Sequence, residues 1–317
     1  MSTHPMFKDE GRPEVATRPT ILLAEAILIA LEDGYRGIQV AGRSGDGKST
    51  ASRYLRSHPS WLKQPTPTAW VSMPRRSNGS DNVFYKVIQG ALNLTSHPRA
   101  AAIDRLSHIV DRISAECEQM AARRFVLFID EAQRLSKDDY EYLANIDDGV
   151  SLDGYRLFCV FVNQSDDSSA EKDNRRCQID DMPPHVVRRF FMADHTFRGL
   201  VGIAEIAEAL GRYDAMEHEG VPFSAYFAPQ AYEKGWRFAS DAQKFVKAVD
   251  EIRKEANLNG QSDFPMMILE LAVKRLLVHI AGGQEVFREF SYESIKEAIM
   301  RAGYLKLEFS RARQLRG

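Results

Sequence analysis

The chain has 317 residues, a formal net charge of -2 and a hydrophobic content of 44%. This length suits one large or two modest domains with a sizeable core, and the charge excludes a protein that is basic overall. Any contact with nucleic acid must therefore come from local patches. The three cysteines, Cys117, Cys159 and Cys177, are widely spaced, which argues against a disulfide framework or a zinc site and fits a reducing cytoplasm.

The N-terminal residues contain no apolar run. They are polar and proline-containing, so we expect a flexible arm over residues 1–20 and neither a signal peptide nor a membrane anchor. An amphipathic helix is predicted over residues 21–31. Because this and the other apolar stretches are too short to span a bilayer, we expect a cytoplasmic protein without membrane contacts.

The segment from Gly42 to Thr50 matches the phosphate-binding loop pattern of Gly, four residues, Gly, Lys and Ser or Thr. An apolar strand is predicted before it, over residues 37–41, and a helix after it, over residues 50–55, which is the context that the pattern requires. Backbone N–H groups at the start of such a helix bind phosphates. We expect the outer phosphates on Lys48, Mg²⁺ on Ser49, and nucleotide contacts from Gly42, Ser44, Gly45, Asp46, Gly47, Lys48, Ser49 and Thr50.

Two further strands and two helices are predicted next along the chain. A strand over residues 68–73 leads into a polar loop, residues 74–80, which is followed by helices over 81–92 and 101–123. The apolar run over residues 125–129 indicates a central parallel strand buried on both faces. It ends in Asp130 and Glu131, which we expect at the carboxyl edge of the sheet, where ligands bind in open α/β folds.

The phosphate loop alone predicts only nucleotide binding, and these two acids add the groups that hydrolysis requires. Asp130 can hold Mg²⁺ through its hydration shell, and Glu131 can orient a water molecule for attack on the terminal phosphate. Asn163 and Gln164 end a predicted strand over residues 157–162 and could contact that water or the phosphate. The residue types do not choose between them, and a plain loop role is an alternative for either.

An arginine supplied by a neighbouring subunit often stabilises the charge that develops in phosphoryl transfer. Arg188 and Arg189 are candidates for this role, although both could simply be surface residues. From about residue 199 the pattern becomes helical, with helices predicted over 230–238, 242–255, 265–279 and 292–302. Strands that alternate with helices before this point predict an α/β fold with a parallel sheet, followed by a smaller all-helical part.

Three segments together resemble an AAA+ ATPase: the loop Gly42 to Ser49, the strand end from Phe128 to Leu135, and Val187-Arg188-Arg189-Phe190. Together with Trp70-Val71-Ser72-Met73-Pro74 they are similar, more narrowly, to the TnsC, TniB and MuB regulators of DNA transposition. The resemblance implies an AAA+ P-loop NTPase fold with a helical lid, which binds ATP and Mg²⁺ and assembles as a ring or filament on duplex DNA. It implies a transposase and a target-selection protein as partners, Arg189 rather than Arg188 as the arginine acting in trans, and DNA backbone contacts from Arg75, Arg76 and Ser77.

The implied domains are an arm (1–20), an AAA+ core (21–200), a helical lid (201–302) and a basic tail (303–317). The segment 259–264 lacks the arginine that many AAA+ lids carry there. Residues 199–235 are expected either to dock a partner or to pad the lid, and the tail either to contact DNA or a partner or to be a frayed terminus. Two alternatives share the catalytic residues: a helicase loader or defence-system ATPase, and a nucleotide-gated assembly protein whose hydrolysis is incidental.

Overall fold

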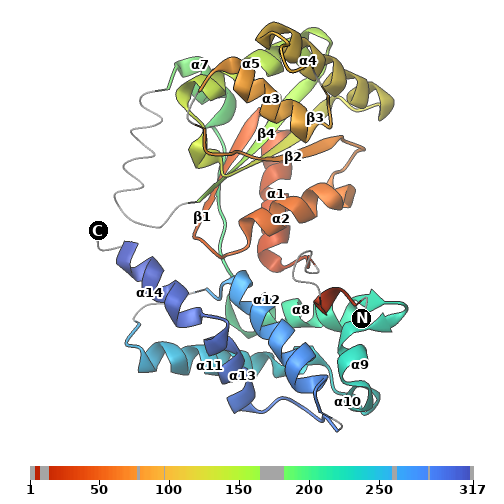
Figure 1. The fold of residues 1–317 in the computed structure, drawn as a ribbon, viewed down its shortest axis with the longest axis vertical. Coiled ribbons are helices and arrows are strands. Elements are labelled where there is room, and N and C mark those ends of the chain that lie inside the picture. Colours follow the sequence, from red (N-terminus) through yellow and green to blue (C-terminus); the bar gives the residue numbers. More distant parts are fainter. Residues whose placement is uncertain are drawn as a thin grey trace. The chain divides into compact units, whose positions relative to one another are not determined.

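The computed structural model describes residues 4–7, 14–76, 79–95, 97–164, 182–258, 263–284 and 286–314, which form two compact units (Figure 1). The sheet unit comprises Leu22–Arg43 and Lys48–Phe197. The helical unit comprises Met1–Ile21, Ser44–Gly47 and Arg198–Gly317. The four central residues of the predicted phosphate loop are thus grouped with the helical unit.

The sheet unit is built on a five-stranded sheet in the order β2-β3-β4-β1-β5, and every strand pairs in parallel with its neighbours. This confirms the predicted α/β fold with a parallel sheet. Side chains are buried along almost the whole of the two central strands, β3 and β4, as expected of a sheet that is covered on both faces. The strands are β1 (Gly37–Gly42), β2 (Thr68–Ser72), β3 (Arg124–Asp130), β4 (Arg156–Gln164) and β5 (Asp194–Thr196).

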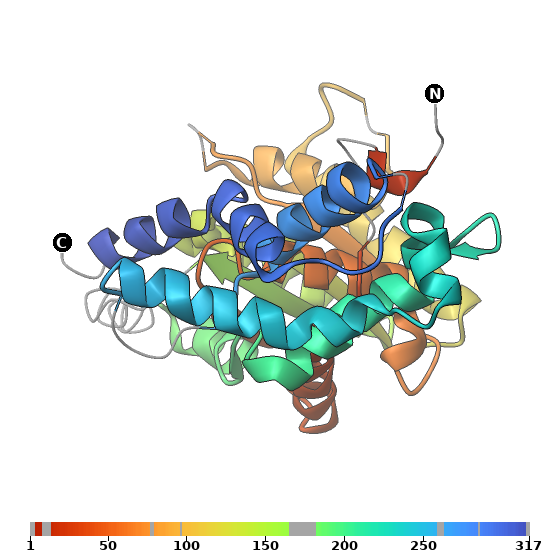
Figure 2. The ribbon, with the colours of Figure 1, turned by 90° about the horizontal axis from the view of Figure 1, so that it is seen from below.

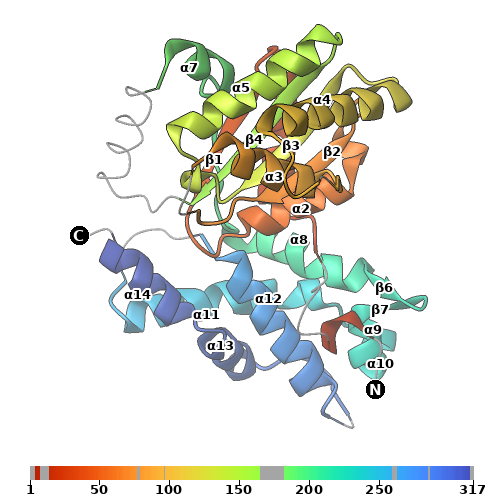
Figure 3. The same cartoon turned by 45° about the horizontal axis from the view of Figure 1, so that its top comes forward.

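Alternate residues of the strands face two separate hydrophobic clusters, because successive side chains of a strand point to opposite faces. Phe125 and Leu127 of β3 pack into one cluster, together with α3, α4 and α5, which cover that face of the sheet in Figure 3. Val126 and Phe128 pack into the other, together with α1 and α2. These helices are α1 (Arg18–Glu32), α2 (Lys48–Ser57), α3 (Asp81–Ala91), α4 (Ala102–Gln119) and α5 (Lys137–Leu152).

Local signals set the starts of two of these helices. Ser80 caps α3 by accepting a hydrogen bond from the backbone N of Val83. Ser136 and Asp139 form a reciprocal capping box at the start of α5. Shorter elements complete the unit: the 3₁₀ helices η2 (Pro59–Trp61) and η3 (Ala132–Arg134), and α7 (Pro184–Phe190).

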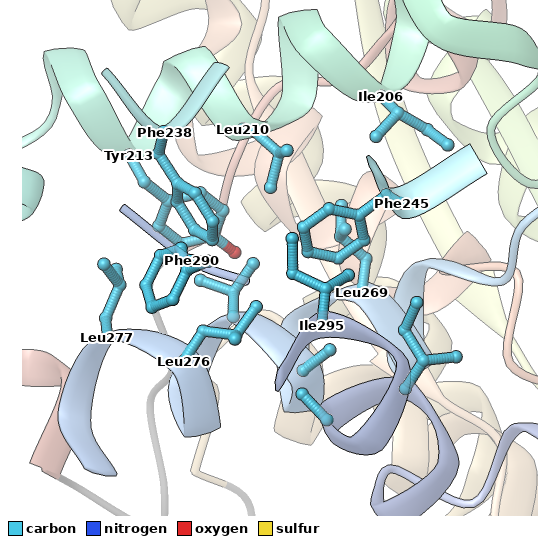
Figure 4. Packing of buried hydrophobic residues seen from close by; sticks show 14 of the residues in the cluster. Ile206, Leu210, Tyr213, Phe238, Phe245, Leu269, Leu276, Leu277, Phe290 and Ile295 are labelled. Atoms are coloured by element: carbon cyan, nitrogen blue, oxygen red, sulfur yellow. The ribbon is translucent and has the colours of Figure 1, made fainter. Parts of the chain in front are cut away.

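The helical unit has a hydrophobic core of its own, which Figure 4 shows from close by. Tyr213, Phe238, Phe245 and Phe290 are among its largest buried side chains. Figure 2 shows blue α14 and cyan α11 from below, and an ion pair between Arg253 and Glu308 joins these two helices. The elements are η1 (Pro5–Phe7), α8 (Gly202–Ala215), β6 (Glu217–His218), β7 (Val221–Pro222), α9 (Phe223–Phe227), α10 (Pro229–Glu233), η4 (Phe238–Asp241), α11 (Ala242–Glu255), α12 (Met266–Lys274), the π-helix η5 (Arg275–Ala281), α13 (Tyr292–Arg301) and α14 (Tyr304–Gln314).

Three expectations for segments of this unit need correction. The predicted helix over 230–238 ends at Glu233, because Gly235 adopts φ +94° and Arg237 is extended. The predicted basic tail is the helix α14 up to Gln314, with Tyr304 fully buried. The arm is not loose where it is described, since α1 begins at Arg18 and residues 5–7 form η1.

None of the helices formed by the described residues is both long enough and apolar enough to cross a bilayer.

Candidate nucleotide-binding site

Gly42 and Lys48 occupy the end of β1 and the start of α2, as the loop pattern requires. The Lys48 ammonium donates hydrogen bonds to the carbonyl oxygens of Gly42 (2.5 Å) and Arg43 (2.7 Å). Gly42 is buried, and a Cβ there would lie 2.3 Å from the carbonyl oxygen of Phe197. Only glycine fits at this position, and its carbonyl helps to fix the lysine at the carboxyl edge of the sheet.

Ser49 follows β1 in the first turn of α2, and Asp130 ends β3. The two side chains meet at this edge, although β4 lies between β1 and β3 in the sheet. The Ser49 hydroxyl donates to Oδ1 of Asp130 over 3.0 Å. Burial of the Asp130 carboxyl raises its pKa because desolvation disfavours the charged form, and the hydrogen bond from Ser49 opposes this effect. Thr50 follows Ser49 in the first turn of α2 and is half-buried.

The pair Ser49 and Asp130 fits magnesium. A hydroxyl and a carboxylate are hard oxygen donors, and Mg²⁺ is usually held by one or two such groups together with water and phosphate oxygens. Among the residues that the structure describes there is no group of three or more His, Cys, Asp or Glu that could form a cage from protein ligands alone.

Glu131 has an unusual backbone conformation and two side-chain partners. It adopts the left-handed region (φ 56°, ψ 35°) at the start of η3, which is costly for a residue other than glycine and is common at functional sites. Its Oε2 accepts hydrogen bonds from Arg134 (2.7 Å) and from Gln133 (3.0 Å). Arg134 also donates to the Met73 carbonyl (2.7 Å), so it connects Glu131 to the end of β2.

The sequence predicted Glu131 but not these partners. Gln133 and Arg134 stand two and three residues after it, in the same short segment, and the spacing of Glu131 and Arg134 is that of an ion pair across one helical turn. This spacing was the signal that could have identified Arg134.

Asn163 and Gln164 end β4 beside the loop, opposite Ala41 and Gly42 of β1. The Asn163 amide donates to Oε1 of Gln39 (2.9 Å), which orients it. Gln164 is exposed, and its backbone N donates to Oε1 of Gln133 (3.1 Å). Both lie at the edge that carries Asp130, and the choice between them stays open.

The structure does not bring the candidate trans arginines to this edge. Helix α7 packs against α5 and against the Gly37 end of β1. Arg188 is exposed, whereas Arg189 donates to Asp148 (2.5 Å) and to the Ala144 carbonyl (3.0 Å) of α5. The hydrogen bond to Asp148 raises the pKa of the Arg189 guanidinium. Within one chain, Arg189 is thus held on α5 and not at the edge that carries Lys48.

The two arginines predicted to contact DNA differ in environment. Arg75 is exposed after β2. Arg76 forms an ion pair with Asp139, and its guanidinium lies 5.6 Å from the centre of the Phe84 ring. The side chains of Arg76 and Asp139 are only 9% and 0% exposed, respectively. The predicted contact residue Ser77 lies outside the described residues. Of the two described candidates, Arg75 is thus the one available to a ligand.

Residues Ser44 to Gly47 contact the helices with which they are grouped. Gly47 adopts φ 103°, which requires glycine, and the Gly45 carbonyl accepts from the backbone N of Met267 (3.1 Å). From α14, Arg311 donates to the Ser44 carbonyl and to Oδ1 of Asp46, both at 2.5 Å. Asp46 and Arg311 are both buried.

Arg311 is therefore a candidate site residue that was not predicted. In the sequence it lies in the terminal tail, far from segment 259–264, which lacks the arginine that many AAA+ lids carry. Tyr304, Glu308 and Arg311 are all buried and follow one another at helical spacing, i, i+4 and i+7. That periodicity was the available signal for a packed final helix.

Comparison with known proteins supports these observations. Residues 32–165 match the family model of the AAA domain. No curated protein matches the sequence. The structure is similar to the ORC2 protein of Aeropyrum pernix, in ADPNP and ADP complexes, with a TM-score of 0.52 and 16% identity over 94% of this chain and 71% of that one.

Two other solved structures are similar at lower TM-scores. Drosophila ORC bound to DNA has a TM-score of 0.48 and 14% identity over 84% of this chain and 62% of that one. The ORC1 protein of Aeropyrum pernix in complex with DNA has a TM-score of 0.43 and 13% identity over 95% and 86%. At such identities the similarity concerns the fold alone.

Proposed function

We propose that this chain, whose fold is that of an AAA+ P-loop NTPase, binds ATP with Mg²⁺ and hydrolyses it. The observation that carries this proposal is the meeting of Ser49 and Asp130 at the carboxyl edge of the sheet, with Lys48 before Ser49 and Glu131 after Asp130. Among the described residues, we found no second segment whose sequence matches a nucleotide-binding pattern.

In the proposed reaction, each of these residues would have a defined role. The Lys48 ammonium would exchange its carbonyl partners for oxygens of the outer phosphates, because its positive charge is attracted to their negative charge. Ser49 and Asp130 would hold the magnesium ion, which neutralises charge on the phosphates. Glu131 would orient a water molecule and accept its proton, and Asn163 or Gln164 would contact that water or the terminal phosphate.

ATP hydrolysis by three proteins tests this part: the wild type, Glu131→Gln and the control Glu118→Gln, which changes an exposed glutamate of α4. Glu131→Gln keeps the shape and loses the base, so we expect nucleotide binding to persist while turnover falls by at least about a hundredfold. The control should hydrolyse ATP as the wild type does. Equal turnover in all three would remove Glu131 from the mechanism.

We further propose that ATP-bound subunits assemble on duplex DNA and regulate transposition, with a transposase and a target-selection protein as partners. The similarity of the sequence motifs to the TnsC, TniB and MuB group supports this, as does the exposed Arg75 in the loop after β2. With a net charge of only -2, each subunit can offer a short basic loop without an overall basic surface. Arg189 of one subunit would complete the site of its neighbour.

Binding to duplex DNA tests the role of the loop. Arg75→Ala should weaken binding about equally for all sequences and reduce the slope of its salt dependence by about one, because a phosphate contact is lost. Arg112→Ala is the control, since Arg112 is an exposed arginine of α4. If Arg75→Ala and the control bind equally well and with the same slope, the loop is not a DNA contact.

The transposition role has its own test. Electron microscopy of the wild type with ATP and duplex DNA should show rings or filaments on the DNA, and these should form with Glu131→Gln as well. In a transposition assay, Glu131→Gln and Arg75→Ala should both lower insertion at the selected target. Assembly that proceeds equally well without nucleotide would contradict the proposed switch. Binding to a replicative helicase in place of a transposase would identify a helicase loader.

A further inference from the structure

The N-terminal segment of the helical unit contacts residues that are remote in sequence. His4 precedes η1 and is completely buried, and Met6 is buried as part of the hydrophobic core. The His4 ring centroid lies 4.4 to 4.9 Å from the centroids of four rings of this unit, namely Phe223, Tyr226, Phe227 and His218. A fully buried polar ring near a chain terminus indicates a specific contact rather than a frayed end.

We call these four residues the aromatic patch, and other contacts hold it in place. His218 belongs to the hairpin β6–β7, and the three remaining residues belong to α9, which follows it. Asp214 of α8 accepts a hydrogen bond from Ser224 Oγ of α9 (2.5 Å) and from the backbone N atoms of Phe238 (2.9 Å) and Ala239 (3.0 Å). Asp214 thus connects α9 to α8 and η4 through hydrogen bonds that do not involve residues 4–7.

The segment that covers the patch has its own internal geometry. The backbone N of Met6 donates to Nδ1 of His4 (3.2 Å), and the backbone N of Phe7 donates to the His4 carbonyl (3.1 Å). Nδ1 must therefore be an acceptor, so His4 is neutral with its proton on Nε2. The Phe7 ring meets the Phe227 ring edge to face, with centroids 5.6 Å apart.

From this geometry we propose that the aromatic patch is a peptide-docking site and that its ligand is the chain's own segment His4–Phe7. The ligand chemistry is a neutral histidine followed by proline, methionine and an aromatic residue. Tyr226 and Phe7 are each more than 40% exposed, so the seated segment leaves apolar surface uncovered at its rim. Part of the stretch 199–235, for which the sequence left two roles open, then serves to dock the N-terminal segment.

A proton on His4 opposes docking. It would remove the acceptor for the Met6 N–H and place a cation beside His218, whose Nε2 lies 3.8 Å from a Glu219 carboxylate oxygen. Tyr226 is the titratable group that α9 presents, and the Asp214 carboxylate of α8 already accepts three hydrogen bonds. Burial, and secondarily His218, lower the pKa of His4 from 6.5 to about 4. Docking is therefore strongest above pH 6.5 and weakens as the pH falls from 6.5 towards 4.

The experiment places the disruptive change in the ligand and leaves the patch intact. Met6→Asp in the full chain puts a charge on the buried methionine and should empty the patch. A fluorescent synthetic peptide with the sequence of residues 1–8 is then titrated into three full-length proteins: the wild type, Met6→Asp and the control Met120→Asp. Met120 is an exposed methionine at the end of α4.

We expect the peptide to bind Met6→Asp at least about tenfold more tightly than the wild type or the control, in which the tethered segment occupies the patch. The same peptide with His4→Ala should bind Met6→Asp at least about tenfold more weakly. The proposal is overturned if all three proteins bind the peptide equally, or if the His4→Ala peptide binds as well as the unchanged one.

A second measurement does not depend on the folding of Met6→Asp. A protease site is placed within residues 8–13 of the full chain, which is then cleaved and passed over a sizing column. The released N-terminal peptide should stay with the protein at neutral pH and separate from it at about pH 4.5, where His4 of the free peptide is protonated and docking must remove that proton. Separation at neutral pH would show that the segment is held only by its tether, contrary to the proposal.

Discussion

Gly42→Ala perturbs the first position of the predicted phosphate loop by a single methyl group. That methyl would lie 2.3 Å from the carbonyl oxygen of Phe197 and 3.2 Å from Cδ of Lys48, and real Cβ contacts essentially never fall below 3.0 Å. The oxygen belongs to the backbone, and the neighbouring N–H of Phe197 is held by the Ala41 carbonyl over 2.7 Å. The clash can be relieved only if β5 and β1 separate at this point.

The expected cost follows from these two effects. Overpacking of a rigid site costs about 1–3 kcal/mol, and a weakened backbone hydrogen bond adds about 1 kcal/mol. A loss of about 3 kcal/mol lowers the melting temperature of a unit of this size by roughly 6–12 °C. Because the methyl also presses on the Lys48 side chain, we expect nucleotide affinity to fall at least about tenfold.

Thermal denaturation followed by circular dichroism, with titration of a fluorescent ATP analogue, measures both effects. Gly90→Ala is the matched control, because Gly90 is an exposed residue of α3 and a Cβ there would meet nothing within 4 Å. The control should gain roughly 0.5 kcal/mol from helix propensity and bind nucleotide normally. If Gly42→Ala melts and binds nucleotide as the wild type does, the close approach of Phe197 is not a rigid feature of the site.

Three further changes test other parts of the site. Asp130→Asn should abolish Mg²⁺-dependent nucleotide binding yet raise stability without Mg²⁺ by about 1 kcal/mol in thermal melts. This advantage of the variant should disappear as the pH falls, because a raised carboxyl pKa means that the wild type gains stability when Asp130 takes up a proton. Arg311→Met leaves Asp46 and Glu308 without their shared cation, so a loss of about 3 kcal/mol is expected in urea denaturation, part of which Asp46→Asn should restore. Arg189→Ala should change stability by less than about 1 kcal/mol but lower ATP turnover of the DNA-bound assembly at least tenfold, and unchanged turnover would exclude it as the trans-acting arginine.

Much of the sheet unit could be predicted from the sequence, for a physical reason. Its central strands are buried on both faces, so β3 and β4 are continuous apolar runs, and their ends are marked by Asp130 and Asn163. The loop pattern before Lys48 was equally clear, because glycine is required where the backbone adopts a positive φ or approaches another strand. Strand β5 was not predicted, because three residues between loops carry no periodic signal.

The contacts among the predicted residues were decided by the tertiary structure alone. Arg75 and Arg76 are adjacent residues of the same type, yet Arg75 is exposed whereas Arg76 forms an ion pair with Asp139. Asp139 belongs to α5, which begins roughly sixty residues later in the chain. Arg134 was visible beside Glu131, but its bond to the Met73 carbonyl depends on the pairing of β2 with β3.

The two ends of the chain show the same limit most plainly. By sequence, His4 and Arg311 belong to polar termini, and such residues are usually solvated. Each is instead buried by partners that come from remote parts of the chain, His4 by the aromatic patch and Arg311 by Asp46 and Glu308. The sequence by itself predicted the central strands β3 and β4, the phosphate loop and the acidic pair that ends β3, because these depend on local periodicity and spacing. Only the folded chain decided which charged and aromatic side chains meet, because burial of a polar group depends on whether a distant residue completes its hydrogen bonds.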